Sequence, residues 1–187
     1  MARIIWQENF GNNEPNGVLG NISTISSGKR PQIKEAEPYS EVNIPILGAS
    51  SIMGYTNSIL YDKKLLVTGR VGTHGIIQRY NRPCWPSDNT LVLNSNFYEF
   101  VYQILKSIDF SSMNRGSTQP LITQTDLKKV SIYVPTKTEL IEFEDIVGVL
   151  MNQYDINIIE NENLVQLRDA LLPKLISGEI SVPQAAK

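Results

Sequence analysis

Cysteine, histidine and long apolar runs are all scarce in this chain of 187 residues. The single cysteine, Cys84, excludes a disulfide framework within the chain and is typical of a reducing cytoplasm. No apolar run approaches the ~20 residues that a membrane-spanning helix needs. The N-terminal stretch has one basic residue and the acids Glu8 and Glu14, so we do not expect a secretory signal there. With 41% hydrophobic and 19% charged residues, the composition is that of an ordinary globular protein with one core.

The same scarcity limits the chemistry that the chain can perform. His74 is the only histidine, so no metal site built from several His and Cys ligands can form within one chain. A Cys84–His74 nucleophile pair stays open, but no third group that would orient the histidine follows a recognisable pattern. No GxGxxG opens a helix, and no GxxxxGKS/T phosphate-binding loop occurs. We therefore expect no catalytic residue, no metal site and no cofactor bound by the chain itself.

One enzyme class remains as an alternative, a metal-dependent DNA nuclease. Such a site combines an upstream acid with an acid-x-Lys stretch, and two stretches of this chain imitate it. Spacings of this kind arise by chance in most chains of this size. The stretches are Asp62-Lys63-Lys64 and Asp126-Leu127-Lys128, with Glu41 or Asp109 as the upstream acid.

Charge is unevenly distributed along the sequence. The net charge of −2 argues against a nucleic-acid partner, yet residues 28–130 contain 12 Lys/Arg and 8 Asp/Glu. Residues 131–187 contain 4 Lys/Arg and 9 Asp/Glu. A mildly basic segment followed by an acidic one predicts two surfaces with different partners.

Short β-like runs alternate with turns up to Pro135. The clearest runs lie at 64–69, 75–80, 89–93 and 129–135, separated by Gly, Ser, Pro and Asn. One amphipathic helix interrupts them in NFYEFVYQILKSIDF, where apolar residues recur at helical spacing. We expect this stripe to belong to the core: Phe97, Phe100, Val101, Ile104, Leu105 and Ile108.

Beyond Pro135 the pattern becomes continuously helical. TKTE at 136–139 predicts a capping box, and residues 139–172 contain one glycine and no proline. A helix of about 34 residues is ~50 Å long, which is too long to bury against one small domain. We therefore expect part of it to pack on another helix. The alternative is an exposed helix that frays. Pro173 is expected to kink or end the helix, and Gly178 to follow its end. The predicted seam comprises Phe143, Val147, Leu150, Tyr154, Ile158, Val165, Leu171 and Leu172.

Four motifs together resemble the DNA specificity subunits of type I restriction–modification systems. The start of a target recognition domain in that family is similar to LGNISTISSGKRP (19–31). Its middle motif is similar to LLVTGRVGTHGII…CWPSDNTLVL (65–93), and its closing motif to GSTQPLITQTDLKKVSIYVP (116–135). The family's C-terminal conserved segment is similar to LVQLRDALLPKLISGEI (164–180). All four stand in the family's order.

The resemblance implies an α/β (α+β) fold, with a β-rich recognition domain followed by a long helix that forms a coiled-coil-like dimerisation arm. It divides the chain into a linker-like segment at 1–18, a target recognition domain at 19–135 and a conserved helical region at 136–187. Full-length subunits carry two recognition domains and two conserved helices, and a stretch like IIWQENFGNNEPNG joins their first helix to their second domain. With one domain and one helical region, this chain resembles half a subunit.

The function that the resemblance implies is recognition without catalysis. Such subunits read half of a split double-stranded DNA target per domain, and their helices hold methyltransferase subunits and, through them, the restriction subunit. S-adenosylmethionine would belong to the methyltransferase partner, since this chain lacks an Asn-Pro-Pro-Tyr motif. We expect a cytoplasmic homodimer. A regulator that pairs with a full-length specificity subunit is the alternative among binding proteins.

Polar residues in the predicted loops are the candidate DNA contacts. In GRVGTHG (69–75), glycines would shape tight turns around basic side chains. Arginine can donate two hydrogen bonds to guanine, and glutamine can pair with adenine in the same two-pronged way. Trp85 is expected to pack beneath a loop rather than to stack on a base. The candidates are Lys29, Arg30, Ser50, Ser51, Tyr55, Arg70, His74, Arg79, Arg82, Arg115, Ser117, Thr118 and Gln119.

Overall fold

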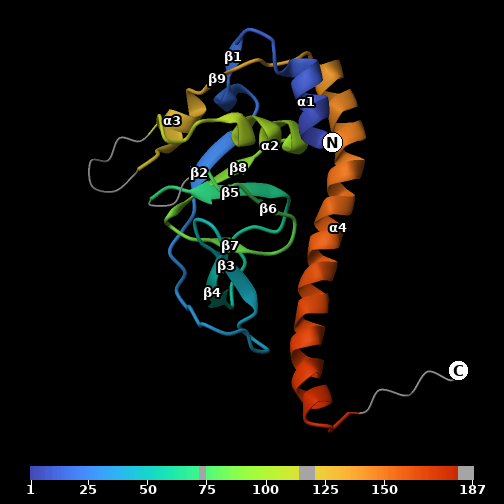
Figure 1. Ribbon diagram of the computed structural model, residues 1–187. Coiled ribbons are helices and arrows are strands. Elements are labelled where there is room, and N and C mark those ends of the chain that lie inside the picture. Colours follow the sequence, from blue (N-terminus) through green and yellow to red (C-terminus); the bar gives the residue numbers. More distant parts are fainter. Residues whose placement is uncertain (72–74, 114–120, 181–187) are drawn as a thin grey trace, which may run out of the picture.

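The protein combines a β-rich body with one very long helix that runs along its side (Figure 1). The computed structural model describes residues 1–71, 75–113 and 121–180. The helices are α1 (Ala2–Phe10), α2 (Tyr98–Ser107), α3 (Gln124–Lys128) and α4 (Lys137–Ile176), with a short 3-10 turn at Leu19–Asn21. The strands are β1 (Gly17–Val18), β2 (Thr24–Ser27), β3 (Ile44–Leu47), β4 (Ile52–Thr56), β5 (Leu65–Gly69), β6 (Gln78–Tyr80), β7 (Trp85–Pro86), β8 (Thr90–Asn94) and β9 (Ser131–Ile132). This arrangement confirms the expected fold class.

A four-stranded antiparallel sheet in the order β2-β8-β5-β6 forms the centre of the body. In its two inner strands, Leu66 lies opposite Leu93 and Val67 opposite Val92. Every residue of β5 and most of β8 is buried, which explains why the sequence has short continuous apolar runs there and no polar alternation. The strands expected at 64–69 and 89–93 are confirmed to within one residue at each end.

Two smaller sheets lie at opposite ends of the body. The first, in the order β4-β3-β7, pairs β3 antiparallel to β4 and parallel to β7. The second pairs β1 with β9, so that Gly17 meets Ile132 and the two ends of the recognition domain close on each other. The expected strands at 75–80 and 129–135 are real but shorter, because only Gln78–Tyr80 and Ser131–Ile132 are paired.

Helix α2 packs against the main sheet through the apolar stripe that the sequence predicts. Phe100, Val101, Ile104 and Leu105 are buried, and Phe97 and Ile108 are partly buried against the same cluster. The core prediction is therefore confirmed.

Helix α1 departs from the prediction, because residues 1–18 are not simply a linker. Trp6 and Phe10 are each 7% exposed and belong to the main core. The ring of Phe10 packs edge-on against Phe100 at 5.3 Å and Phe143 at 5.5 Å between centroids. These partners come from α2 and α4, far along the sequence, so no local pattern indicated them.

The beginning of α4 also belongs to the core of the body. The hydroxyl of Thr136 accepts from the Glu139 amide (3.3 Å) and the Thr136 amide donates to the Glu139 carboxylate (2.8 Å), which confirms the capping box. Phe143 and Val147 are buried in the same cluster as α2. The boundary expected at 135/136 thus does not separate two packing units. The assignment of Phe143 and Val147 to a partner seam is wrong, because the chain's own body covers them.

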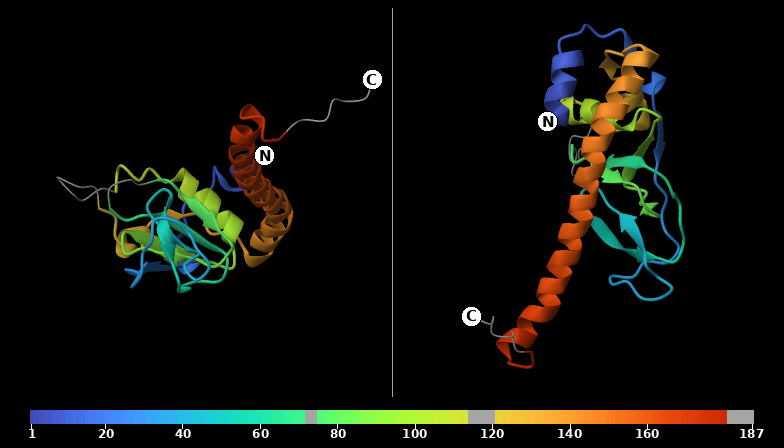
Figure 2. Two further views of the ribbon diagram at one scale, coloured as in Figure 1. Left: turned by 90° about the horizontal axis from the view of Figure 1, so that it is seen from below. Right: turned by 90° about the vertical axis from the view of Figure 1, so that its right-hand side faces the viewer.

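The remainder of α4 forms an arm that first runs beside the body and then projects beyond it (Figure 2). We use this word for residues 152–176. Leu150 is half-buried, while the other predicted seam residues are exposed: Tyr154, Ile158, Val165, Leu171 and Leu172. In the described part of the chain, no helix is long and apolar enough to cross a membrane.

The arm ends later than expected. The helix continues through Pro173 to Ile176, so Pro173 does not end it, and a kink at Pro173 stays a prediction. The carbonyl that Pro173 leaves without an amide partner lies on an exposed turn, where water can satisfy it. Gly178 follows the end as predicted, with φ of 75° and its N–H donated to the Leu175 carbonyl (3.2 Å).

Candidate nucleic-acid interface

Three strand ends meet at one edge of the main sheet. Because β2 and β5 both run antiparallel to β8, their last residues, Ser27 and Gly69, lie opposite Leu91 and Thr90 at the beginning of β8. The segments that follow β2 and β5 therefore leave the sheet at the same edge. In Figure 1 the β5 arrow points away from α4, so this edge lies across the body from the long helix.

The loop after β2 presents Lys29 and Arg30 on a firmly held backbone. The Lys29 N–H donates to the Pro86 carbonyl (2.9 Å), and the Trp85 indole N–H donates to the Lys29 carbonyl (2.7 Å). A Cβ at Gly28 would collide with the carbonyl oxygens of Pro86 and Ser87, so only glycine allows the two backbones to approach this closely. Trp85 packs beneath the loop, as predicted, and both basic side chains are exposed.

Arg70 lies at the same edge, directly after β5. Its N–H donates to the Asn89 carbonyl (2.8 Å), and its carbonyl accepts from the Ile122 N–H (3.0 Å). The side chain of Arg70 is half-exposed. We call Lys29, Arg30 and Arg70 together the basic edge.

Five predicted contacts lie outside the described residues: His74, Arg115, Ser117, Thr118 and Gln119. Two described residues next to these segments are Val71, which follows Arg70 of the basic edge, and Leu121. They form an isolated β-bridge with each other, so both lie at the basic edge. Gly75, where the chain is described again, has φ of 78°, a left-handed conformation that favours glycine.

The structure does not bring Ser50, Ser51 and Tyr55 to the basic edge. Ser50 and Ser51 lie at the tip of the β3–β4 hairpin, where the Gly48 N–H donates to the Ser51 carbonyl (2.8 Å). The Gly48 carbonyl accepts from the Gln78 side chain (2.7 Å), which ties the tip to β6. Both serines line a groove between the hairpin, β6 and α4, and Tyr55 lines an adjoining hollow. These three side chains form a second candidate group that faces α4.

Arg79 is buried and its guanidinium contacts side chains of the protein itself. Its side chain is 6% exposed, and its guanidinium donates to both carboxylate oxygens of Glu99 on α2 and of Asp155 on α4, the latter at 2.9 and 2.8 Å. The guanidinium also lies 4.9 and 4.8 Å from the rings of Tyr98 and Tyr102. Burial opposes its charge, but hydrogen bonds with Asp155 and Glu99 raise the pKa of Arg79 above its ordinary value. Because these contacts use the donors that a base or phosphate would need, we withdraw Arg79 as a DNA contact.

Arg82 also contacts α4. It forms an ion pair with Glu162 at 3.2 Å, and the two side chains are 42% and 49% exposed. Arg82 therefore remains partly accessible, and its role as a DNA contact stays a prediction.

Two residues of the catalytic alternatives, Cys84 and Asp126, have structural roles. Cys84 is fully buried, and burial raises the pKa of its thiol to about 12, so the thiol stays protonated near neutral pH. Asp126 caps α3 by accepting from the Thr123 N–H (3.0 Å) and hydroxyl (2.7 Å). Within residues 1–71, 75–113 and 121–180, no three His, Cys, Asp or Glu side chains are grouped so as to hold a metal ion. Asp62 is exposed, and the nuclease alternative is left to experiment.

The sequence analysis missed the acidic residues that join α4 to the body. Glu144 accepts from the first amides of α2, those of Glu99 (3.1 Å) and Phe100 (2.8 Å), and burial raises the pKa of Glu144. Asp155 and Glu162 follow about three and five helical turns later, on the same line of the helix. That spacing was readable in the sequence, but the partners on α2 and β6 were not.

A comparison with known protein families identifies the family of the chain. Residues 16–168 match the type I restriction modification DNA specificity domain. The chain belongs to this family. The match covers the basic edge, α2, α3 and most of α4, and it confirms the resemblance that the four sequence motifs indicated.

Two similar proteins are specificity subunits of type I restriction enzymes. The HindI specificity subunit of Haemophilus influenzae is 26% identical over 187 residues, covering 87% of this chain and 41% of that subunit. The MjaIX specificity subunit of Methanocaldococcus jannaschii is 34% identical over 101 residues, covering 50% of this chain and 22% of that subunit. The chain therefore spans less than half the length of these relatives.

Solved structures show the same fold. The S subunit of the type I system from M. genitalium matches 89% of this chain and 47% of its own, with a TM-score of 0.63 and 16% identity. The HsdS subunit from Thermoanaerobacter tengcongensis matches 96% of this chain and 50% of its own, with a TM-score of 0.51 and 17% identity. A mixed body followed by a long helix is thus the fold that this specificity domain shares with S subunits.

Proposed function

We propose that this specificity domain is the non-catalytic DNA-reading component of a type I restriction–modification methyltransferase complex. In this proposal it acts as a homodimer in the cytoplasm, and each copy reads one half-site of double-stranded DNA. The observation that carries the proposal is the division of the chain into a basic edge on one side of the body and an apolar arm on the other. Family membership supports the DNA-reading role.

The basic edge is suited to DNA because it holds positive charge on a rigid backbone. Lys29 is held by hydrogen bonds to residues 85 and 86, and Arg70 by hydrogen bonds to Asn89 and Ile122. Contacts of this kind to phosphates position a protein on the duplex, while base edges are read by arginine and amide side chains. Leu121, which follows the segment that carries Arg115 and Gln119, pairs with Val71 at this edge, so we assign base reading to these two residues.

The exposed apolar residues of α4 support dimerisation. Monomeric proteins rarely leave a large contiguous apolar patch at the surface, and a helix that is apolar on several sides is normally buried. The arm has exposed large apolar side chains, with exposed fractions between 36% and 79%. They are Tyr154, Ile156, Ile158, Ile159, Leu164, Val165, Leu167, Leu171, Leu172, Leu175 and Ile176.

Two lines of apolar residues run along α4, which gives it room for two different partners. At about 100° per residue, Ile158, Val165 and Leu172 continue the line of Val147 past Met151, the last buried apolar residue of the helix. Another line with Val149, Ile156 and Leu167 lies on the opposite side of the helix, and Val149 is 73% exposed. We assign one line to the helix of a second copy and the other to the methyltransferase subunits.

The reaction itself belongs to the partners in this proposal. The methyltransferase subunits would hold S-adenosylmethionine and transfer the methyl group, and a restriction subunit would join through them. A second candidate is a regulator that pairs with a full-length specificity subunit, since the exposed apolar lines of α4 would suit a helix of that subunit as well as a helix of a second copy.

Reconstitution tests the proposal. The chain is combined with the methyltransferase subunits of its own genome, plasmid DNA and S-adenosylmethionine, and methylated bases are mapped by sequencing. We expect methylation at one motif, and only when the chain is present. Methylation that requires an added full-length specificity subunit would favour the regulator.

Incubation of the chain alone with plasmid and Mg²⁺ or Mn²⁺ tests the nuclease alternative. Cleavage that Asp62→Ala or Asp126→Ala abolishes would replace the proposal.

A further inference from the structure

The polar contacts between α4 and the body fall on one line of the helix. Glu144 receives the first amides of α2, Asp155 binds Arg79, and Glu162 binds Arg82. At 1.5 Å per residue this line spans about 27 Å of the helix axis. We call Glu144, Asp155 and Glu162 the acidic stripe.

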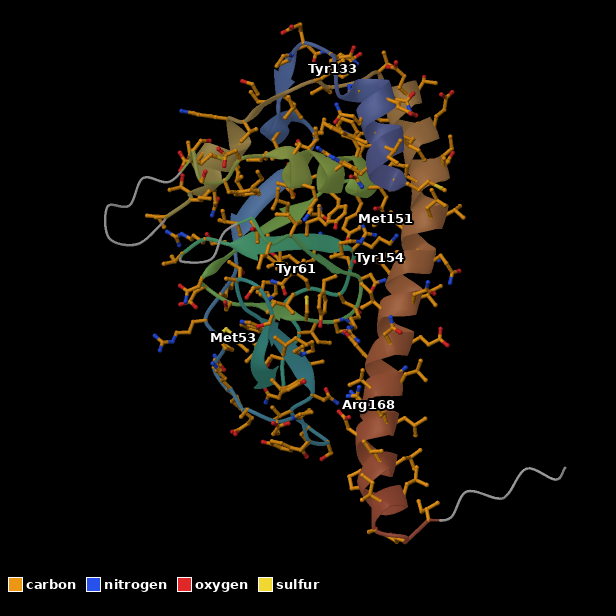
Figure 3. The ribbon with its side chains drawn as sticks, in the orientation of Figure 1. Met53, Tyr61, Tyr133, Met151, Tyr154 and Arg168 are labelled. Atoms are coloured by element: carbon orange, nitrogen blue, oxygen red, sulfur yellow. The ribbon has the colours of Figure 1, made fainter. Side chains whose placement is uncertain are left out.

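Apolar packing holds only the beginning of α4. In the described chain, the last apolar side chain of α4 that is buried is Met151, at 9% exposure. Figure 3 shows Met151 and Tyr154 on the side of the helix that faces the body. Beyond Met151, Asp155 is the next strong contact with the body, so the direction of the arm depends on this contact.

The contact at Asp155 is geometrically restrictive. The side chains of Arg79 and Asp155 are 6% and 13% exposed, so water screens their pairing weakly. A planar guanidinium that forms two-pronged pairs with two carboxylates permits one orientation of each. Because Glu99 is fixed on α2, Arg79 transmits the position of α2 and β6 to the arm.

We propose that the Arg79 cluster, which consists of Arg79, Glu99 and Asp155, sets the direction of the arm relative to the basic edge. In a dimer it thereby sets the length of the spacer between two half-sites, and this second part rests on the proposed function. The cluster lies across the body from the basic edge and acts through geometry, so its members are positioning residues. Buried ion pairs contribute little net stability, but they can specify one arrangement among several.

The direction of the arm matters because the DNA helix couples distance to rotation. Each additional base pair moves the second half-site by ~3.4 Å and rotates it by roughly 34–36°. A dimer with fixed arms can accept a wrong spacer only by deforming the DNA, which lowers affinity. A dimer whose arms pivot can follow several spacers.

Asp155→Ala tests the cluster while the pair between Arg79 and Glu99 stays in place. Asp145→Ala is the matched control, since Asp145 is an exposed acid on the same helix. Glu162→Gln removes the outer contact of the acidic stripe and provides a second, milder variant. Thermal melting of each variant establishes that the body is folded.

The first readout is a distance that involves no DNA. Spin labels are placed at Asp62 in the body and Asn163 on the arm, with Cys84→Ser as background, and labelled chain is diluted into unlabelled chain. We expect a narrow distance distribution in the parent and in Asp145→Ala, and a broader one in Asp155→Ala, with Glu162→Gln in between. Equal widths in the parent and Asp155→Ala would overturn the proposal. If Asp155→Ala fails to melt cooperatively, Asp155→Asn, which removes the charge and keeps the shape of the side chain, decides the outcome by the same comparison.

The second readout is the preference for spacer length, measured on DNA with fixed half-sites and variable spacers. The parent and Asp145→Ala should prefer one spacer over its neighbours by about tenfold or more, and Asp155→Ala by only about two- to threefold, with unchanged half-site bases. An unchanged spacer preference, or altered half-site bases, would contradict the cluster's role. If the parent itself shows no spacer preference, the dimeric reading fails, and the distance distributions alone decide whether the cluster directs the arm.

Discussion

Arginine and lysine residues of this specificity domain divide according to what their charged groups touch. Lys29 and Arg30 are exposed on a loop held by Trp85, whereas Arg79 is buried between two carboxylates. The stretch GIIQRY gives no sign of this difference, because the partners of Arg79 lie 20 and 76 residues away. The same residue type is therefore accessible to a ligand at one place and held within the protein by ion pairs at another.

Single substitutions should separate phosphate contacts from base readers. Lys29→Ala and Arg70→Ala should weaken binding to all sequences alike and reduce the salt dependence by about one unit each. Lys63→Ala, at the opposite end of β5 from Arg70, is the control and should have little effect. Arg115→Ala and Gln119→Ala should each cost roughly 1–3 kcal/mol on the target only. Titrations that show equal losses on target and random DNA would remove these two residues from base reading.

Cys84 gives a second test at this scale. Burial raises the pKa of its thiol from an ordinary 9.0 to about 12, so the native thiol should react slowly with iodoacetamide until the pH approaches 12, while the unfolded chain reacts near pH 9. Since the folded pKa lies above the unfolded one, the thiol contributes stability that is complete below pH 9 and lost as the pH rises toward 12. Stoichiometric labelling of the native protein at pH 8, followed by mass spectrometry, would contradict this burial.

At the scale of elements, the beginning of α4, up to Met151, packs in the core, and the remainder of the helix forms the arm. A chain that ends after Pro135 should not fold, because it lacks Phe143, Val147 and the Glu144 side chain that caps α2. A chain that ends after Asn163 keeps these contacts and should melt cooperatively, but it should no longer self-associate. Thermal melting and sedimentation of both chains measure this. The same oligomer in the parent and the chain that ends after Asn163 would argue against pairing through the arm.

Elements with a strong local signal were predictable from the sequence. The apolar spacing of α2, the Thr136–Glu139 capping box and the run at β5 each depend on neighbours along the chain. Helix α1 was mistaken for a linker, because burial of Trp6 and Phe10 depends on α2 and α4. Pro173 was expected to kink or end the helix, yet the helix continues past it, because the missing hydrogen bond is tolerated on an exposed turn. The basic edge could be listed residue by residue, but its assembly from the ends of β2 and β5 beside the beginning of β8 required the fold.

At the scale of the whole molecule, the proposed dimer predicts that the distance between its two basic edges depends on the length of the arm. Seven residues inserted after Gln166, beyond the contact of Glu162 with the body, keep the apolar lines in phase and add about 10 Å of helix. The half-site bases should stay the same, while the spacer lengthens by up to about three base pairs. Selection from random DNA measures both. Altered half-site bases with an unchanged spacer would contradict this use of the arm.

The sequence of the DNA target tests the central claim most directly. Two identical copies related by a two-fold axis must read the same half-site on opposite strands. Mapping of methylated bases on DNA treated with the reconstituted complex should therefore give an interrupted palindrome that disappears when the chain is omitted. A continuous or asymmetric motif, or a motif that persists without the chain, would contradict the account.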